Sequence, residues 1–285
     1  MSWMYRLDPD FFNLDYTLDC GQVFRWEKNG DWWTGVVGNN VIRLSQEEDS
    51  RELLIDSKLP PEFFSRYFRL DDDLPLIYES INRDLLIDRA IKRYKGLRLI
   101  RQDPWECLIS YMLATASSIP TIQKRICLLS RIFGQELEDG YFSFPDPETL
   151  ANADMSMLDL CKLGFRADRI KMAAEEVCSG ELDFNTLFRL EYKYARERLM
   201  RLRGIGEKVA DCVLLFAFEK MESFPVDTHI RQIIQHYHID DSYFETCTNL
   251  SCMGDWGREY FGRYCGYAQE YLYYQKRVEG FVSLY

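Results

Sequence analysis

The chain has 285 residues, of which 47% are hydrophobic and 28% charged, and its formal net charge is −11. This composition is typical of a globular protein, excludes a low-complexity chain, and allows two domains. No apolar run approaches the roughly 18 residues of a membrane helix, and the N-terminus lacks the basic start and apolar middle of a signal peptide. We therefore expect an intracellular protein with no membrane partner.

The negative net charge counts against a nucleic-acid partner, because phosphate contacts require Lys and Arg. Residues 193–208 differ from the rest, since they hold six basic residues and two acidic ones. A solvated helix face with paired charges and a DNA-binding segment both fit this pattern. No basic run resembles a nuclear address, which favours a prokaryotic cytoplasm.

The nine cysteines are odd in number and without a disulfide-like rhythm, which predicts reduced thiols.

Residues 20–45 alternate apolar and polar residues between turn signals at 29–30 and 38–40, as in a β-meander. Beyond about residue 100 the period becomes helical, with Asp103 as a candidate N-cap before Pro104. Further helices are expected at about 119–134, 155–161, 166–178, 191–202, 207–220, 228–237 and 257–280. We predict an α+β fold with an N-terminal antiparallel sheet domain (1–100) and a larger all-helical region (101–285).

The segment 191–220 is predicted to form a helix-hairpin-helix, with Gly204-Ile205-Gly206 as its turn. Glycines on either side of an apolar residue let the backbone turn sharply and approach another backbone closely. The second helix begins there, so its unpaired N–H groups and positive dipole end can hold a phosphate. Such a hairpin would grip a nucleic-acid backbone without reading its sequence. A purely structural hairpin explains the spacing equally well.

Lys208 lies in the first turn of that second helix. The positive dipole end and the neighbouring arginines disfavour a charged amine, which predicts a nucleophile that attacks carbon. The alternative is a surface lysine that binds phosphate as a point charge. Further along, Asp227 is placed to N-cap the next helix, with His229 in its first turn. If Asp227 faces Lys208, it can accept a proton or stabilise positive charge on a sugar; otherwise it is a capping residue.

These residues resemble a known family. "LRGIGEKVADCVLLFAF" followed by "VDTH" is similar to the helix-hairpin-helix, Gly-Pro-Asp superfamily of DNA base-excision glycosylases. Five other segments resemble, in order, its 8-oxoguanine DNA glycosylases: "LDYTLDCGQVFRW", "QDPWECLISYMLATASSIPTI", "FSFPDPETLA", "LGFRADRI" and "CGYAQEYLYY". The resemblance implies an active site in a cleft of the helical region. It also implies a bifunctional DNA glycosylase/AP lyase that acts, as a monomer, on double-stranded DNA containing 8-oxoguanine.

The resemblance also implies roles for single residues. Lys208 would attack C1′ of the damaged nucleotide, expel the base and form a Schiff base, after which β-elimination nicks the strand. Asp227 would stabilise the cationic sugar. Gly204, Gly206 and His229 would contact the DNA backbone.

Base recognition is implied for four further residues. The carbonyl of Gly21 would accept the N7–H that 8-oxoguanine has and guanine lacks. Gln269 would read the pairing edge of the base, and Tyr273, four residues on, would stack on it. Cys212, one turn after Lys208, would line the base pocket. Without the resemblance, Gly21 would be a turn residue and Tyr273 a core aromatic.

Contacts with the opposite strand are implied for Phe165 and Arg166, which would wedge into the duplex and contact the orphaned base. A loop anchor and a surface charge are the alternatives. Two positions depart from well-known members: Ala116 replaces an asparagine that fills the gap left by the flipped base, and Thr121 replaces an arginine that reads the opposite cytosine. We therefore predict relaxed discrimination of the opposite base.

The resemblance implies no required cofactor and no catalytic metal, and it allows a structural monovalent cation at the hairpin. The endonuclease III branch usually ends in four clustered cysteines that hold an iron–sulfur cluster. Here the late cysteines are Cys247, Cys252 and Cys265, so we expect no cluster. Two alternatives stay open: a glycosylase for another damaged purine that uses no lysine Schiff base, and a non-catalytic helix-hairpin-helix DNA-binding protein.

Overall fold

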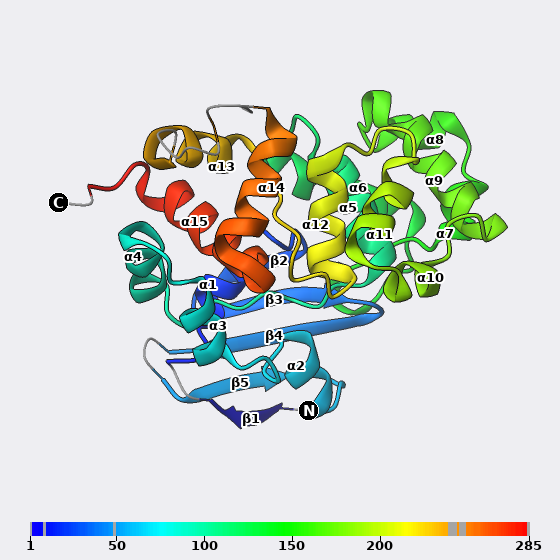
Figure 1. Ribbon diagram of the computed structural model, residues 1–285. Coiled ribbons are helices and arrows are strands. Elements are labelled where there is room, and N and C mark those ends of the chain that lie inside the picture. Colours follow the sequence, from blue (N-terminus) through cyan, green and yellow to red (C-terminus); the bar gives the residue numbers. More distant parts are fainter. Residues whose placement is uncertain (1, 8–9, 48–49, 239–243, 245–248, 284–285) are drawn as a thin grey trace.

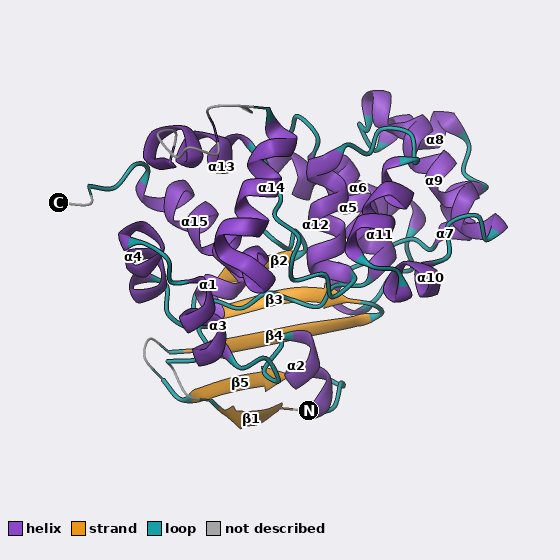
Figure 2. Cartoon of the chain, viewed as in Figure 1, coloured by secondary structure: helices purple, strands orange, loops and turns teal. Residues whose placement is uncertain are grey.

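The computed structural model describes residues 2–7, 10–47, 50–238, 244 and 249–283. Figures 1 and 2 show the strands gathered in one layer and most of the helices packed together on one side of it. An N-terminal antiparallel sheet followed by a mostly helical region is the α+β fold that the sequence predicts. No helix among the described residues is long and apolar enough to cross a membrane.

The sheet has five strands in the order β1-β5-β4-β3-β2, and every neighbouring pair is antiparallel. The strands are β1 (Ser2–Arg6), β2 (Trp26–Asn29), β3 (Trp32–Val37), β4 (Asn40–Gln46) and β5 (Glu52–Asp56). The two predicted turns connect β2 to β3 and β3 to β4, which confirms the meander. The alternation pattern did not predict β1 and β5, which pair with each other at one side of the sheet.

The helical region begins as predicted. Pro104 opens its helix, and the side chain of the N-cap Asp103 accepts the backbone N–H of Glu106 at 2.9 Å. The helices are α1 (Leu14–Asp19), α2 (Pro61–Tyr67), α3 (Leu74–Ile81), α4 (Leu85–Arg93), α5 (Pro104–Ala114), α6 (Ile119–Phe133), α7 (Pro147–Ala151), α8 (Met155–Leu160), α9 (Ala167–Ser179), α10 (Phe184–Arg189), α11 (Tyr192–Met200), α12 (Glu207–Ala217), α13 (Thr228–Ile233), α14 (Leu250–Phe261) and α15 (Cys265–Glu279). The single helix predicted at 257–280 is wrong, because a turn at Gly262–Tyr264 separates α14 from α15.

Buried side chains form two hydrophobic clusters. The smaller one packs against the sheet and includes Trp26, Ile42 and Phe68. The larger one fills the helical region, and it also takes in Cys20 and Phe24 from the loop that follows α1. This loop therefore enters the core of the helical region. The boundary between the predicted domains 1–100 and 101–285 stays a prediction.

The loop after α1 is anchored by Gln22, whose side chain is 1% exposed. Its amide nitrogen donates to the carbonyls of Thr17 at 3.0 Å and Arg98 at 2.8 Å, and its side-chain oxygen accepts the N–H of Ile100 at 2.7 Å. A buried amide needs such partners on both atoms. The position of the neighbouring Gly21 is thereby fixed.

The last helix packs against the first. In α15, the hydroxyl of Tyr274 donates to the carboxylate of Asp19 at 3.2 Å, and Arg277 donates to the same oxygen at 2.7 Å. The rings of Tyr16 and Tyr274 are 6.1 Å apart. The loop after α1 thus lies against α15.

The cysteines differ in part from the expectation of reduced thiols. Cys252 is in a disulfide, so that expectation is wrong for this residue. Cys247 lies outside the described residues. Within the described part of the chain, the free cysteines are Cys20, Cys107, Cys127, Cys161, Cys178, Cys212 and Cys265.

Candidate active site

A cleft of about 1000 Å³ opens where the hairpin, the loop after α1, the segment before α13 and helix α15 meet. Nine of the predicted site residues line it: Gly21, Gly204, Gly206, Lys208, Cys212, Asp227, His229, Gln269 and Tyr273. Phe165 and Arg166 are not part of its lining. Residues from four distant parts of the sequence therefore converge on one cavity.

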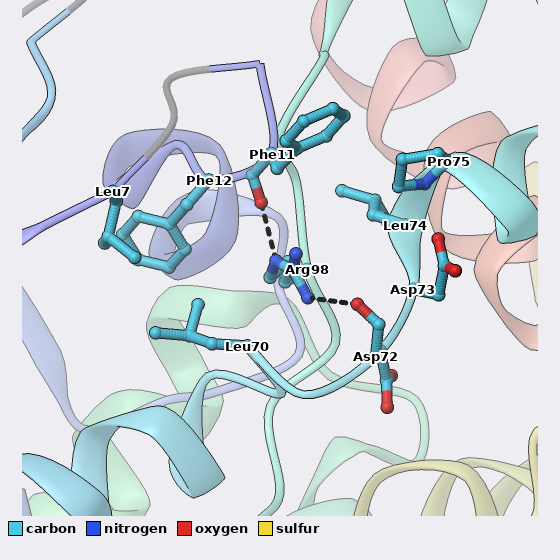
Figure 3. Close-up of a pocket in the computed structure, with 9 residues that line it drawn as sticks. All are labelled: Leu7, Phe11, Phe12, Leu70, Asp72, Asp73, Leu74, Pro75 and Arg98. Atoms are coloured by element: carbon cyan, nitrogen blue, oxygen red, sulfur yellow. Dashed lines mark hydrogen bonds between the residues drawn. The ribbon is translucent and has the colours of Figure 1, made fainter.

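A smaller cavity of about 250 Å³ lies in the N-terminal half, around Arg98 (Figure 3). Nε of Arg98 donates to the carbonyl of Phe11 at 2.6 Å, and Nη1 donates to the carbonyls of Arg69 and Asp72. The guanidinium thus holds three chain segments together. We assign this cavity a structural role and the larger cleft a functional one.

The hairpin forms as predicted, with α11 and α12 joined by the glycine turn. Gly204 has a φ of +92°, in the left-handed region that favours glycine, and a Cβ there would lie 2.5 Å from Cδ of Arg169. Gly206 is the N-cap of α12 and provides no side-chain cap. The first N–H groups of α12 are therefore available to an anion such as a DNA phosphate.

Lys208 is partly buried in the first turn of α12. Its Nζ lies 5.1 Å from the ring centroid of Tyr111, whose hydroxyl donates to the carbonyl of Gln22 at 3.2 Å. Among the described residues, no carboxylate lies within ion-pair distance of Nζ. The amine is thus positioned against an aromatic ring, with room to approach a ligand in the cleft.

Asp227 is the N-cap of α13, as predicted, and its Oδ1 accepts the N–H of Ile230 at 2.8 Å. The cap holds one carboxylate oxygen at the wall of the cleft that contains Lys208. Two residues on, the ring of His229 meets that of Tyr273 edge-on, with centroids 5.4 Å apart. Nδ1 of His229 is buried and has no hydrogen-bond partner among the described residues.

The far wall of the cleft is formed by Gly21 and α15. Gly21 has a φ of +100°, and a Cβ on it would lie 3.3 Å from Cε1 of Tyr273, so glycine suits both the conformation and the space. Gln269 is 4% exposed, and its Oε1 has no partner among the described residues. Burial raises the pKa of Cys212 to about 12, so its thiol is neutral in this wall.

Glu270 also lines the cleft, and the sequence did not predict it as a site residue. It is 3% exposed, and burial raises its pKa to about 7. A helical glutamate is usually solvated, so nothing in its sequence neighbourhood marks it as buried. The nearest signal is its place beside Gln269 in "YAQEYLYY".

Phe165 and Arg166 lie in the turn before α9. Phe165 is 56% exposed, and the guanidinium carbons of Arg166 and Arg169 lie 4.2 and 4.8 Å from its ring centroid. Arg166 is 5% exposed, and its Nη2 donates to the carbonyl of Thr115 and to Oγ of Ser117. Arg166 therefore braces the loop 115–118, which lines the cleft. Contact of either side chain with DNA stays a prediction.

A buried aspartate stabilises the hairpin. Asp211 is 3% exposed, and its Oδ1 accepts hydrogen bonds from Tyr192 at 2.7 Å and from Arg196 at 2.9 Å, which join α11 to α12. We expect Asp211→Ala to lower the free energy of unfolding by about 3 kcal/mol, because it removes the acceptor of the Tyr192 hydroxyl and the nearer carboxylate of Arg196, which keeps Glu207 at 3.5 Å as a partner. Chemical denaturation measures the change. The exposed Asp159→Ala is the control, and an equal loss in both variants would contradict the prediction.

Sequence comparisons support the family resemblance. Residues 4–108 match the family described as 8-oxoguanine DNA glycosylase, N-terminal domain, and residues 115–247 match the HhH-GPD superfamily base excision DNA repair protein. The "Probable N-glycosylase/DNA lyase" of Methanothermobacter thermautotrophicus is 32% identical over 266 residues, which cover 85% of this chain and 81% of the relative. The N-glycosylase/DNA lyase OGG1 of Arabidopsis thaliana is 26% identical and covers 94% of this chain and 78% of its own.

Solved structures of similar proteins support the same family. MBOgg1 in complex with a low-affinity DNA ligand is 34% identical with a TM-score of 0.90, over 98% of this chain and 96% of its own. The Clostridium acetobutylicum 8-oxoguanine glycosylase/lyase, bound to duplex DNA with cytosine opposite 8-oxoG, is 31% identical with a TM-score of 0.87, over 95% of this chain and 93% of its own. The chain therefore belongs to the 8-oxoguanine DNA glycosylases of the helix-hairpin-helix, Gly-Pro-Asp superfamily.

Proposed function

We propose that this chain excises 8-oxoguanine from double-stranded DNA and then nicks the strand at the resulting abasic site. Relatives that match most of the chain are named N-glycosylase/DNA lyase. The observation that carries the proposal is the convergence of Lys208, Asp227, Gly21 and Gln269 on one cleft from four separate elements.

In the proposed reaction, the amine of Lys208 attacks C1′ of the everted nucleotide through its nitrogen lone pair, and the C1′–N9 bond breaks as the base leaves with its electron pair and takes up a proton. The amine then loses a proton and the sugar ring opens, which gives a Schiff base. β-Elimination then removes a proton from C2′ and breaks the C3′–O bond, which releases the strand on the 3′ side with a phosphate at its 5′ end. The anionic Asp227 stabilises positive charge on the sugar while it forms.

The proposed base pocket is formed by Gly21, Cys212, Gln269 and Tyr273. The carbonyl of Gly21 accepts the N7–H of the lesion, and the unpartnered Oε1 of Gln269 accepts an N–H from the pairing edge. Tyr273 stacks on the ring. Eversion costs a few kcal/mol, which contacts in this pocket offset.

Contacts with the rest of the duplex are proposed for the outer residues. The hairpin around Gly204 and Gly206, together with His229, holds the DNA backbone. Phe165 wedges into the duplex, and Arg166 meets the orphaned base by exchanging its hydrogen bonds to Thr115 and Ser117 for bonds to that base.

Borohydride trapping tests the proposed function. Reduction of the Schiff base should leave the wild-type protein covalently joined to an 8-oxoguanine duplex. Failure to crosslink would overturn the proposal. A glycosylase for another damaged purine would excise its own lesion without trapping, and a non-catalytic DNA-binding protein would neither excise nor crosslink.

Relaxed opposite-base discrimination is part of the proposal. Ala116 has no side-chain donor for a base. The hydroxyl of Thr121 is hydrogen-bonded to that of Ser118, with 2.9 Å between their oxygens. Arg166 is therefore the remaining candidate to recognise the opposite base. We expect excision rates within about tenfold of one another for duplexes with each of the four bases opposite the lesion. Single-turnover rates measure this, and a strong dependence on cytosine would contradict it.

We propose that the reaction needs no cofactor, because Lys208 and Asp227 supply the nucleophile and the anion. A structural monovalent cation at the hairpin, the lack of an iron–sulfur cluster and the monomeric state stay predictions. A location in a prokaryotic cytoplasm, close to the nucleoid, is also a prediction. It is based on the lack of a basic run that resembles a nuclear localisation signal.

A further inference from the structure

Two consecutive residues of α15 have buried oxygen atoms without a donor. Gln269 and Glu270 are 4% and 3% exposed, both line the cleft, and Oε1 of each lacks a hydrogen-bond partner among the described residues. Buried acceptors are normally paired, so unpaired ones at a binding site call for donors from the ligand. The proposed reaction gives such a role to Gln269 and none to Glu270.

Glu270 lies next to the loop that carries the proposed reader of N7. Glu270 lines the cleft together with Gly21, and burial and the carboxyl of Glu270 raise the pKa of Cys20, the residue before Gly21. Tyr273, one turn further along α15, contacts Gly21, since a Cβ built there would lie 3.3 Å from Cε1 of Tyr273. Residues three apart in a helix share a face, so Glu270 and Tyr273 both face this loop.

We propose that Glu270 is a second reader of the damaged base, whose carboxylate accepts the N7–H that distinguishes 8-oxoguanine from guanine. The inference rests on the proposed function. A hydrogen bond to a carboxylate is stronger than one to a neutral carbonyl. Guanine has a lone pair at N7, which a buried carboxylate repels. Glu270 therefore weakens binding of the normal base as well as strengthening binding of the lesion.

The protonation state of Glu270 makes this reading depend on pH. Burial raises its pKa to about 7, so the side chain is ionised above that pH and neutral below it. A neutral carboxyl carries an O–H that can donate to N7 of guanine. Discrimination of the lesion from guanine should therefore rise as pH increases through about 7.

The thiols and phenols around Glu270 do not cause this pH trend. Burial raises the pKa values of Cys20, Cys212, Tyr111 and Tyr273 well away from neutrality, so these groups stay neutral between pH 6 and 8. Lys208, Asp227 and Arg277 also face it, and His229 lines the same cleft. All four are present in wild type and in the Glu270 variants, so a comparison of the proteins isolates Glu270.

Binding to uncleavable duplexes tests the proposal. A 2′-fluoro sugar prevents excision, and the probes carry either 8-oxoguanine or guanine on that sugar, opposite cytosine. We expect the ratio of the guanine Kd to the 8-oxoguanine Kd to rise about tenfold in wild type between pH 6 and 8. In Glu270→Gln the ratio should be lower and independent of pH, because an amide can donate an N–H to N7 of guanine at any pH.

Two further variants complete the experiment. Glu270→Asp restores a carboxylate and should recover a rise of the ratio with pH. Glu259→Gln, on the exposed face of α14, is the matched control and should behave as wild type. If neither Glu270 variant folds, as judged by circular dichroism, the wild-type ratio decides alone, and a ratio that does not change with pH overturns the proposal.

Failure of this inference is distinguishable from failure of the proposed function. If Glu270→Gln keeps the wild-type ratio of Kd values and its pH trend, the inference is overturned. A structural role predicts that Glu270→Gln weakens binding to both duplexes by the same factor, and this result would overturn the inference too. In either case wild type would still excise 8-oxoguanine. Loss of excision and trapping in wild type would instead overturn the proposed function.

Discussion

Lys208→Gln is expected to lower the single-turnover rate of 8-oxoguanine excision at least about a thousandfold and to abolish borohydride trapping. Glutamine has nearly the length of lysine but no nucleophilic amine. The side chain is partly buried against Tyr111, and this packing is retained in large part. Binding to the lesion duplex should therefore persist, which a gel-shift assay on the same protein checks.

Lys92→Gln is a suitable control for this variant. Lys92 is exposed on α4 and forms an ion pair with Asp88 one turn earlier, and exposed pairs of this kind contribute little to stability. Its excision rate should equal that of wild type. If Lys208→Gln excised the lesion as fast as this control, the amine would not be the nucleophile, and a glycosylase that activates water would be the better description.

Asp227→Asn is expected to reduce excision by about 10²–10³-fold, the effect of removing one preorganised electrostatic contact from a transition state. Asparagine keeps a side-chain oxygen that can accept the N–H of Ile230, and it is as good an N-cap as aspartate. The substitution therefore removes the charge and keeps the cap. Single-turnover kinetics and thermal unfolding of the same protein separate the two effects.

The N-cap aspartate of α7 provides the control. Asp146 accepts the N–H of Thr149 at 2.7 Å and lies outside the cleft, so Asp146→Asn should change neither rate nor melting temperature. Asp227→Ala should lose both the charge and the cap, with a further loss of about 1 kcal/mol in stability. Equal rates for Asp227→Asn and wild type would leave Asp227 with a capping role alone.

Much of the fold follows from local patterns. The turn signals between β2, β3 and β4, the N-cap at Asp103 and the glycine turn at 204–206 each depend on a few adjacent residues, and each is confirmed. The pairing of β1 with β5 could not be predicted in this way. It joins residues 2–6 to residues 52–56, and the choice of partner depends on packing within the sheet.

The residues of the candidate site likewise differ in whether adjacent sequence could predict them. The family motifs identify Lys208 and Asp227, and the structure places both in one cleft, while their roles stay predictions. Glu270 and Asp211 could not be found from the sequence, because a charged residue on a helix is usually exposed. Burial of both follows from how separate elements pack: Glu270 lines the cleft with Gly21 of the loop after α1, and Asp211 of α12 pairs with Arg196 of α11.

The contact between α1 and α15 has a consequence for synthesis of the protein. Asp19 and Gly21 are made before the whole helical region, whereas their partners Arg277 and Tyr273 are made after the hairpin, and 258 positions separate Asp19 from Arg277. Loop closure over such a sequence separation is slow and follows local folding. A nascent chain on the ribosome therefore has the hairpin and its lysine before it has a pocket that can select a base.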